Sequence, residues 1–228
     1  MKKAFTLKSL LASMAIAGAT SMSIAPATAQ AGVSANVGYV SNYVFRGIEQ
    51  TESGSASAGL DYEGESGLYA GTWVADVETG LEYDFYAGWA GDITEGVSLG
   101  VGATYYGYTE SAFDDPYKEV NLSIGFGDFT IGYDKGVWMS TASGDTDYDH
   151  LYASVAFGDF GLTIAKMDGD TDTSKDALYY ADLGYSFELA AGLDGAVNYV
   201  YVTPEDKNVG GIDQSFLVLG LSKSFDIM

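Results

Sequence analysis

Apolar residues alternate with small or polar residues along most of the chain from Val33 onward. A period of two places successive side chains on opposite faces of an extended strand, whereas a helical face repeats about every 3.6 residues. The pattern divides into twelve segments of about ten residues, the length that a tilted strand needs to cross a bilayer. In the clearest segment, residues 97–106, one face carries Val97, Leu99, Val101, Ala103 and Tyr105, and the other carries Ser98, Gly100, Gly102, Thr104 and Tyr106.

The connections between these segments alternate in length. Short connections fall at residues 63–66, 91–96, 127–128, 158–159 and 188–194, and longer, more acidic ones lie between them. Outer-membrane barrels have short periplasmic turns and longer extracellular loops, and an even strand number puts both chain ends in the periplasm. We therefore predict an all-β fold, a transmembrane antiparallel up-and-down barrel. It should have twelve strands unless the acidic run 134–149 contains another short one.

The second face of the segments consists mostly of glycine, serine and asparagine. A soluble sheet protein would need well-hydrated residues such as lysine, glutamate and threonine on its outer face. Small residues suit a crowded concave lumen better, so the pattern favours a membrane barrel, with a soluble sheet protein as the alternative. The residues concerned are Asn36, Gly38, Ser57, Gly59, Gly88, Gly100, Gly102, Ser123, Gly125, Gly132, Gly184, Gly220, Ser222 and Ser224.

Aromatic residues fall near both ends of the predicted strands, as in the two interfacial girdles of a membrane barrel. One set, at the ends with short turns, comprises Phe126, Phe129, Phe157, Phe160, Phe187 and Phe225. The set predicted for the opposite end comprises Tyr43, Phe45, Tyr105, Tyr133 and Tyr201. Segment 68–77 carries bulky residues on both faces, so its orientation does not follow from the pattern.

The N-terminal residues have the form of a secretory signal peptide. Lys2 and Lys3 precede an apolar stretch that ends at Ala27-Thr28-Ala29, a small-x-small cleavage signature. We expect residues 1–29 to be removed on export and residues 30–228 to form one barrel domain in the outer membrane. A short membrane anchor is the alternative to a cleaved signal.

The chain is strongly acidic, with a formal net charge of −22. Loss of residues 1–29 would remove three of the 10 basic residues and none of the 32 acidic ones. This charge argues against binding to nucleic acid and favours cations, cationic partners or solvation of the loops. Cysteine is absent from the sequence, so no disulfide framework can stabilise the exported fold.

Four sequence stretches, residues 37–48, 59–63, 66–73 and 82–88, resemble the TorF-type porins of Gram-negative bacteria. They read VGYVSNYVFRGI, GLDYE, SGLYAGTW and EYDFYAG. The resemblance implies an outer-membrane porin-like protein with a poorly defined substrate. Barrel proteins usually end on an aromatic residue that the barrel assembly machinery recognises; here Phe225 precedes the end by three residues, and we expect it to serve that role.

Inward parity predicts a set of charged residues in the lumen. Arg46 is the most plausible cation among them, and it could either order water in a constriction or pair with one acid and brace the wall. Excess carboxylates predict a channel for passive diffusion of small hydrophilic solutes that prefers cations. The lumen candidates are Arg46, Asp61, Glu82, Asp84, Glu119, Asp134 and Asp182.

Two other functions remain open from the sequence. One is a non-conducting structural or binding barrel whose acidic loops contact lipopolysaccharide or partners. The other is a hydrolase that uses His150, the sole histidine, with Asp147 or Asp149, although no nucleophile motif accompanies it. The stretch 168–179 has Thr173 and Tyr179 where an EF-hand has glycine and glutamate, so we expect a solvated loop, with loose divalent-ion bridging as the alternative. We expect no cofactor, no resident metal and no enzymatic activity.

Overall fold

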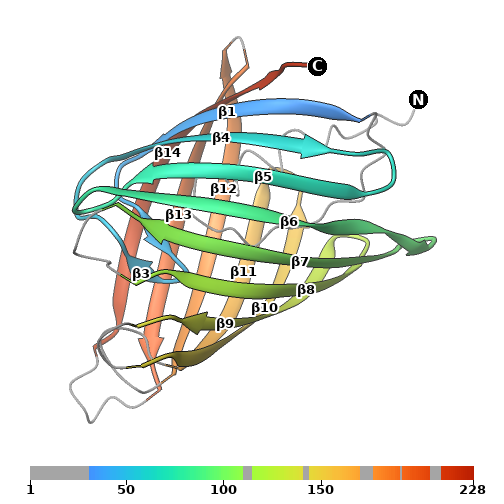
Figure 1. Ribbon diagram of the computed structural model, residues 1–228. Coiled ribbons are helices and arrows are strands. Elements are labelled where there is room, and N and C mark those ends of the chain that lie inside the picture. Colours follow the sequence, from blue (N-terminus) through green and yellow to red (C-terminus); the bar gives the residue numbers. More distant parts are fainter. Residues whose placement is uncertain (1–30, 110–114, 141–143, 170–176, 191, 206–211) are drawn as a thin grey trace.

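The computed structural model describes residues 31–109, 115–140, 144–169, 177–190, 192–205 and 212–228. Twelve antiparallel strands form a closed barrel, seen from the side in Figure 1, so the predicted fold class and strand number are confirmed. The wall strands are β1 (Gly32–Val40), β4 (Ser55–Glu63), β5 (Leu68–Asp76), β6 (Leu81–Thr94), β7 (Val97–Tyr108), β8 (Tyr117–Phe126), β9 (Phe129–Trp138), β10 (Thr146–Phe157), β11 (Phe160–Gly169), β12 (Leu178–Ala190), β13 (Leu193–Pro204) and β14 (Gln214–Asp226).

Each wall strand pairs with the next along the chain, and β14 pairs with β1 to close the sheet. The register of this closing pair runs from Ser34 opposite Asp226 to Val40 opposite Gly220. Beyond it, the Val33 N–H donates to the Met228 carbonyl (3.0 Å) and the Ile227 N–H donates to the Val33 carbonyl (2.8 Å). Closure leaves no unpaired sheet edge, which is what allows a sheet to span a bilayer.

The two ends of the barrel differ in their connections. We call the end that holds the start of β1 and the end of β14 the turn end; wall strands are joined there by connections 64–67, 95–96, 127–128, 158–159 and 191–192. The opposite end, the loop end, holds the connections 41–54, 77–80, 109–116, 139–145, 170–177 and 205–213. The acidic run 134–149 adds no strand among its described residues, since β9 ends at Trp138 and β10 begins at Thr146.

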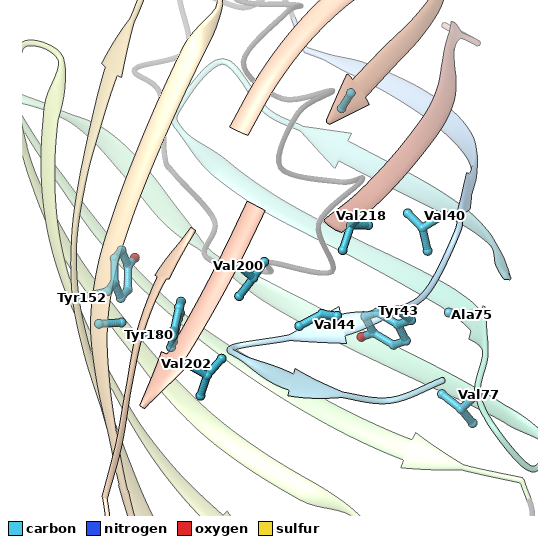
Figure 2. Packing of buried hydrophobic residues seen from close by; sticks show 12 residues of the cluster. Val40, Tyr43, Val44, Ala75, Val77, Tyr152, Tyr180, Val200, Val202 and Val218 are labelled. Carbon is cyan, nitrogen blue, oxygen red and sulfur yellow. The ribbon is translucent and has the colours of Figure 1, made fainter. Parts of the chain in front are cut away.

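Two additional short strands lie in the connection between β1 and β4, the first two strands of the wall. Strands β2 (Val44–Phe45) and β3 (Ile48–Glu49) form a small hairpin of their own within the connection 41–54. We call residues 41–54 the lumen hairpin, because their side chains pack against the inner face of the barrel. Figure 2 shows Tyr43 and Val44 beside Val200, Val202 and Val218 of the wall.

The lumen hairpin changes two features of the sequence prediction. Tyr43 and Phe45 do not belong to an interfacial girdle, because Tyr43 is buried in the interior cluster and Phe45 packs against it. The hairpin also settles the orientation of β5: Trp73 points inward, where its ring lies 5.7 Å from the Tyr43 ring, and Leu68 is exposed on the outer face.

The outer face of the wall carries the large apolar residues. They are exposed along every wall strand, whereas the inner face carries small residues, tyrosines and the charged residues described below. Examples from different strands are Leu60, Phe85, Val101, Leu122, Ile131, Leu151, Ile164, Leu183, Tyr199 and Leu217. Among the described residues, no helix is both long and apolar enough to cross a membrane.

Candidate functional site

The tip of the lumen hairpin has an unusual residue for its backbone conformation. Phe45 pairs with Ile48, so Arg46 and Gly47 form a two-residue turn, and both have positive φ angles, 50° and 81°. Such turns normally carry Asn-Gly or Asp-Gly, because a left-handed conformation costs most other residues about 1–2 kcal/mol. Arg46 is the only non-glycine residue with positive φ in the described part of the chain. Its side-chain contacts must offset this cost.

The Arg46 side chain is buried and binds two carboxylates of the opposite wall. Its Nη1 and Nη2 donate to both oxygens of Glu119 in β8, with 3.1 Å from Nη2 to Oε2. Nη2 also donates to Asp134 Oδ2 in β9 at 3.0 Å. Burial alone would lower the pKa of the Arg46 guanidinium, but the Glu119 carboxylate beside it holds that pKa well above its usual value. Arg46 is therefore a permanent cation in the lumen.

Groups of the barrel wall position the Glu119 carboxylate independently of Arg46. The Tyr148 hydroxyl donates to Oε1 at 2.7 Å, and the Tyr106 hydroxyl and Asn121 Nδ2 each donate to Oε2 at 3.0 Å. Tyr106 lies on β7, Asn121 on β8 and Tyr148 on β10, so three strands contribute donors. An ionised carboxylate only accepts hydrogen bonds, and these donors satisfy it in the orientation that faces Arg46.

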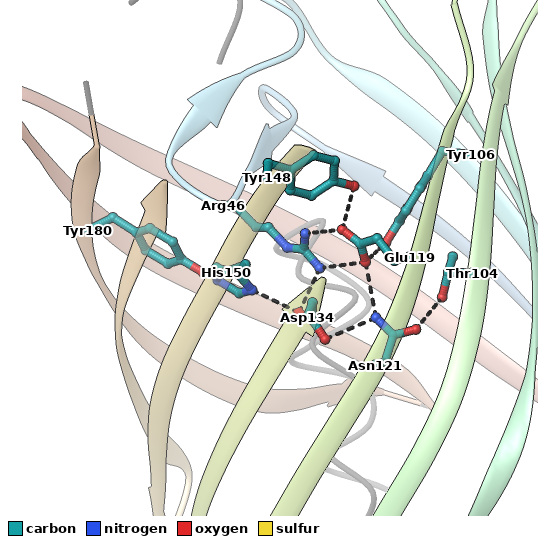
Figure 3. A network of polar contacts seen from close by, with 9 residues as sticks. All are labelled: Arg46, Thr104, Tyr106, Glu119, Asn121, Asp134, Tyr148, His150 and Tyr180. Carbon is teal, nitrogen blue, oxygen red and sulfur yellow. Dashed lines mark hydrogen bonds and ion pairs between the residues drawn. The ribbon is translucent and has the colours of Figure 1, made fainter. Parts of the chain in front are cut away.

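Asp134 is positioned in the same way. Asn121 Nδ2 donates to its Oδ1 at 2.9 Å, and the Nδ1–H of His150 donates to its Oδ2 at 2.8 Å. The other ring nitrogen of His150 lies 2.9 Å from the Tyr180 hydroxyl on β12. Figure 3 shows the resulting chain of contacts from Tyr180 to the Arg46 guanidinium. We call Glu119 and Asp134 the carboxylate pair.

The partners of His150 differ from the pairing that the hydrolase alternative requires. His150 is fully buried against Asp134 and Tyr180, whereas Asp147 and Asp149 contact Lys135, at 3.4 and 3.3 Å. The reason is the alternation of β10, which turns odd-numbered side chains away from the face that carries His150. The alternative in which His150 works with Asp147 or Asp149 is therefore not supported by these contacts.

The second attachment of the lumen hairpin is at Tyr43. Its hydroxyl donates to Glu82 Oε1 on β6 at 2.8 Å, and its backbone N–H donates to Thr51 Oγ1 at 2.9 Å. Two positions along β6, Asp84 is fully buried, and neither of its carboxylate oxygens has a hydrogen-bond partner among the described residues. The hairpin is thus fixed to two sides of the lumen.

The remaining lumen candidates lie apart from the hairpin. Asp61, close to the turn end on β4, accepts from Asn36 Nδ2 at 3.0 Å and from the Tyr86 hydroxyl. Asp182 on β12 accepts from Asn198 Nδ2 at 2.8 Å. Four of the seven predicted residues therefore lie around the lumen hairpin, Arg46 belongs to the hairpin itself, and two lie elsewhere. The four are Glu82, Asp84, Glu119 and Asp134.

Sequence reasoning missed the donors that hold the carboxylates. They lie at the inward-facing positions of their strands, which was the available signal. Asn121 follows Glu119 by two positions, Tyr180 precedes Asp182 by two, and Tyr148 and His150 share one face of β10. The residues concerned are Tyr106, Asn121, Tyr148, His150 and Tyr180.

Several solved structures are similar to the barrel. A KdgM porin superposes with a TM-score of 0.55 at 10% identity, covering 84% of this chain and 99% of its own. A chain described under "Unveiling the Mechanism Behind the in-meso Crystallization of Membrane Proteins" also scores 0.55, at 11% identity, covering 87% of this chain and 84% of that one. Pseudomonas aeruginosa OpdL scores 0.46 at 11% identity, covering 86% and 68%. At these identities the first two show a shared fold.

The sequence itself matches one family. No curated protein matches it. Residues 24–221 match the family described as "Bacterial protein of unknown function (Gcw_chp)", a range that covers nearly all of the barrel. The chain therefore belongs to the Gcw_chp family of bacterial proteins.

Proposed function

We propose that the protein is an outer-membrane channel for passive diffusion of small hydrophilic solutes, with a preference for cations. The observation that carries the proposal is the charge inside the barrel at the level of the lumen hairpin, where Arg46 binds the carboxylate pair and Tyr43 binds Glu82. Three carboxylates against one guanidinium give a negative interior, which attracts cations and repels anions. The shared fold with a KdgM porin is consistent with this role.

The proposed location follows from the apolar outer face. Exposed aliphatic residues in the middle of the wall strands suit lipid, and aromatic residues at the turn end suit a membrane interface. We place the turn end toward the periplasm and the loop end outside. The predicted signal peptide lies outside the described residues. We also propose that the barrel assembly machinery recognises Phe225 and that the acidic loops contact lipopolysaccharide. The resemblance to TorF-type porins is in keeping with the same function.

Charge at the outer face tests the membrane location. Leu122, 45% exposed near the middle of β8, should face the bilayer core, so Leu122→Lys should destabilise the barrel by about 2–4 kcal/mol. Ile93, 55% exposed near the turn end of β6, should lie at an interface, so Ile93→Lys should cost only about 0–1 kcal/mol. Urea titration of barrels folded into lipid vesicles, followed by tryptophan fluorescence, measures both. Equal losses of stability for the two variants would contradict the placement of Leu122 in the bilayer core and of Ile93 at its interface.

Ion selectivity tests the channel itself. We expect stepwise conductance in planar bilayers and, in a KCl gradient, a reversal potential displaced toward that of K⁺. Glu82→Gln should reduce this displacement, because it removes one of the three carboxylates that contact the hairpin. Lys135→Ala, which changes a charge on the outer face, is the matched control and should leave the reversal potential unchanged. Anion selectivity would contradict the proposed preference.

A non-conducting barrel is the second candidate function. It is favoured by the burial of the lumen side chains around the hairpin, since Asp84 and His150 are fully buried and Glu119 is nearly so. With the hairpin in this position, the inner face at its level is covered. A folded barrel that inserts into bilayers without stepwise conductance would support this candidate over the channel.

A further inference from the structure

The carboxylate pair is organised by the barrel wall alone. Glu119 and Asp134 lie on neighbouring strands, and Asn121 Nδ2 bridges them with contacts of 3.0 and 2.9 Å. Tyr106, Tyr148 and His150, which also donate to the two carboxylates, likewise come from wall strands. Donors that do not belong to the lumen hairpin thus orient the pair, as a preformed binding site requires.

A guanidinium already occupies this site. Arg46 engages both oxygens of Glu119 and one oxygen of Asp134, although it belongs to a different segment that reaches the site from across the lumen. Its backbone adopts φ = 50°, which an arginine rarely does, and its Nε is buried without a partner among the described residues. The guanidinium group of Arg46 thus fits the carboxylate pair well, whereas the backbone of Arg46 is strained.

The charges at the site leave it negative even when Arg46 is seated. Two carboxylates, those of Glu119 and Asp134, face the single guanidinium of Arg46. A second cation is therefore attracted to the position that Arg46 occupies.

We infer that the carboxylate pair is a binding site for guanidinium-bearing solutes, and that Arg46 is a built-in occupant that such a solute displaces. A planar guanidinium donates two parallel hydrogen bonds to one carboxylate, whereas an ammonium acts as a point charge, so the site selects guanidinium over amine. The claim that such a solute passes through the barrel rests on the proposed channel function, whereas the claim that it binds the carboxylate pair does not.

Calorimetric binding of methylguanidinium tests the inference. The probe is titrated into purified wild-type barrel and into the Arg46→Ala variant, in detergent at constant ionic strength. We expect the variant to bind it about tenfold more tightly than the wild type, equal to about 1.4 kcal/mol, because no tethered guanidinium competes. Methylammonium should bind the variant clearly more weakly, and Glu119→Gln added to Arg46→Ala should abolish the gain.

Equal affinities of wild type and variant, or no preference over methylammonium, would overturn the inference. If Arg46→Ala does not fold, Arg46→Lys retains the charge but not the two-pronged contact, and it should still bind methylguanidinium more tightly than the wild type. Conductance of the wild-type barrel is measured separately in bilayers. Binding without conductance would contradict the channel alone, and conductance without binding would contradict the guanidinium site alone.

Discussion

Replacing residues 41–54 with Asn-Gly should raise the single-channel conductance several-fold. Val40 and Ser55 lie directly opposite each other in the register of β1 and β4, so a two-residue turn can join them without moving either strand. The change removes Tyr43, Val44 and Arg46 from the lumen, where they now cover the inner face. Single-channel recording in planar bilayers gives the conductance directly, and slower migration after heating in gel electrophoresis verifies that the shortened barrel folds.

The control for this experiment changes the hairpin without removing it from the lumen. Glu52→Gln alters an exposed residue of the same segment and should conduct as the wild type does. A wild-type barrel that is silent, together with a shortened barrel that conducts, would mean that the hairpin closes the lumen completely. Equal conductance of wild-type and shortened barrels would show that the hairpin does not limit the pore.

The wall of the barrel was predictable because each of its residues has one of two environments. Leu122 and Ile164 must face an apolar surrounding, and Ser123 and Thr163 beside them must not. This requirement repeats at every second position over about ten residues, long enough for the period to be recognised. The strand number and the inward parity of the acids follow from the same repetition.

The lumen hairpin was not predictable, for two reasons. Strands β2 and β3 have two residues each, which is too short for any period to be visible. Tyr43 and Phe45 also have the composition of an interfacial girdle, and only their contacts with Trp73 and Tyr106 show that they lie inside. A folded-back segment is defined by tertiary contacts that the local sequence does not encode.

The grouping of the charged residues was predictable only in part. Alternation places Glu119 and Asp134 on the inner face, and their strands are neighbours, so their proximity follows from the fold. Arg46 is 73 residues from Glu119, and its strands β2 and β3 pair with no wall strand. Which wall strands the arginine reaches depends on the tilt of the barrel and the path of the hairpin across it, and neither can be read from a period of two.

Arg46→Ala should lower the free energy of unfolding by about 3–5 kcal/mol, because it leaves a buried carboxylate pair without its cation. The side chains of Arg46, Glu119 and Asp134 are 2%, 0% and 4% exposed, so water does not replace the lost contacts unless the hairpin moves away. Urea titration of barrels in lipid vesicles measures the loss. Lys135→Ala removes the same charge from the outer face, where the side chain is 41% exposed, and should cost no more than about 1 kcal/mol.

The origin of this loss can be separated from the loss of side-chain packing. If uncompensated charge is the cause, adding Glu119→Gln and Asp134→Asn to Arg46→Ala should restore much of the stability. The amide oxygens can still accept from Tyr148 and His150, and the amide NH2 at position 119 can donate to the Tyr106 hydroxyl oxygen. If packing of the arginine stem is the cause, the triple variant should be no more stable than Arg46→Ala. A loss as small as that of Lys135→Ala would mean that the carboxylate pair is hydrated in the absence of Arg46, and that the rest of the hairpin does not exclude water from this level of the lumen.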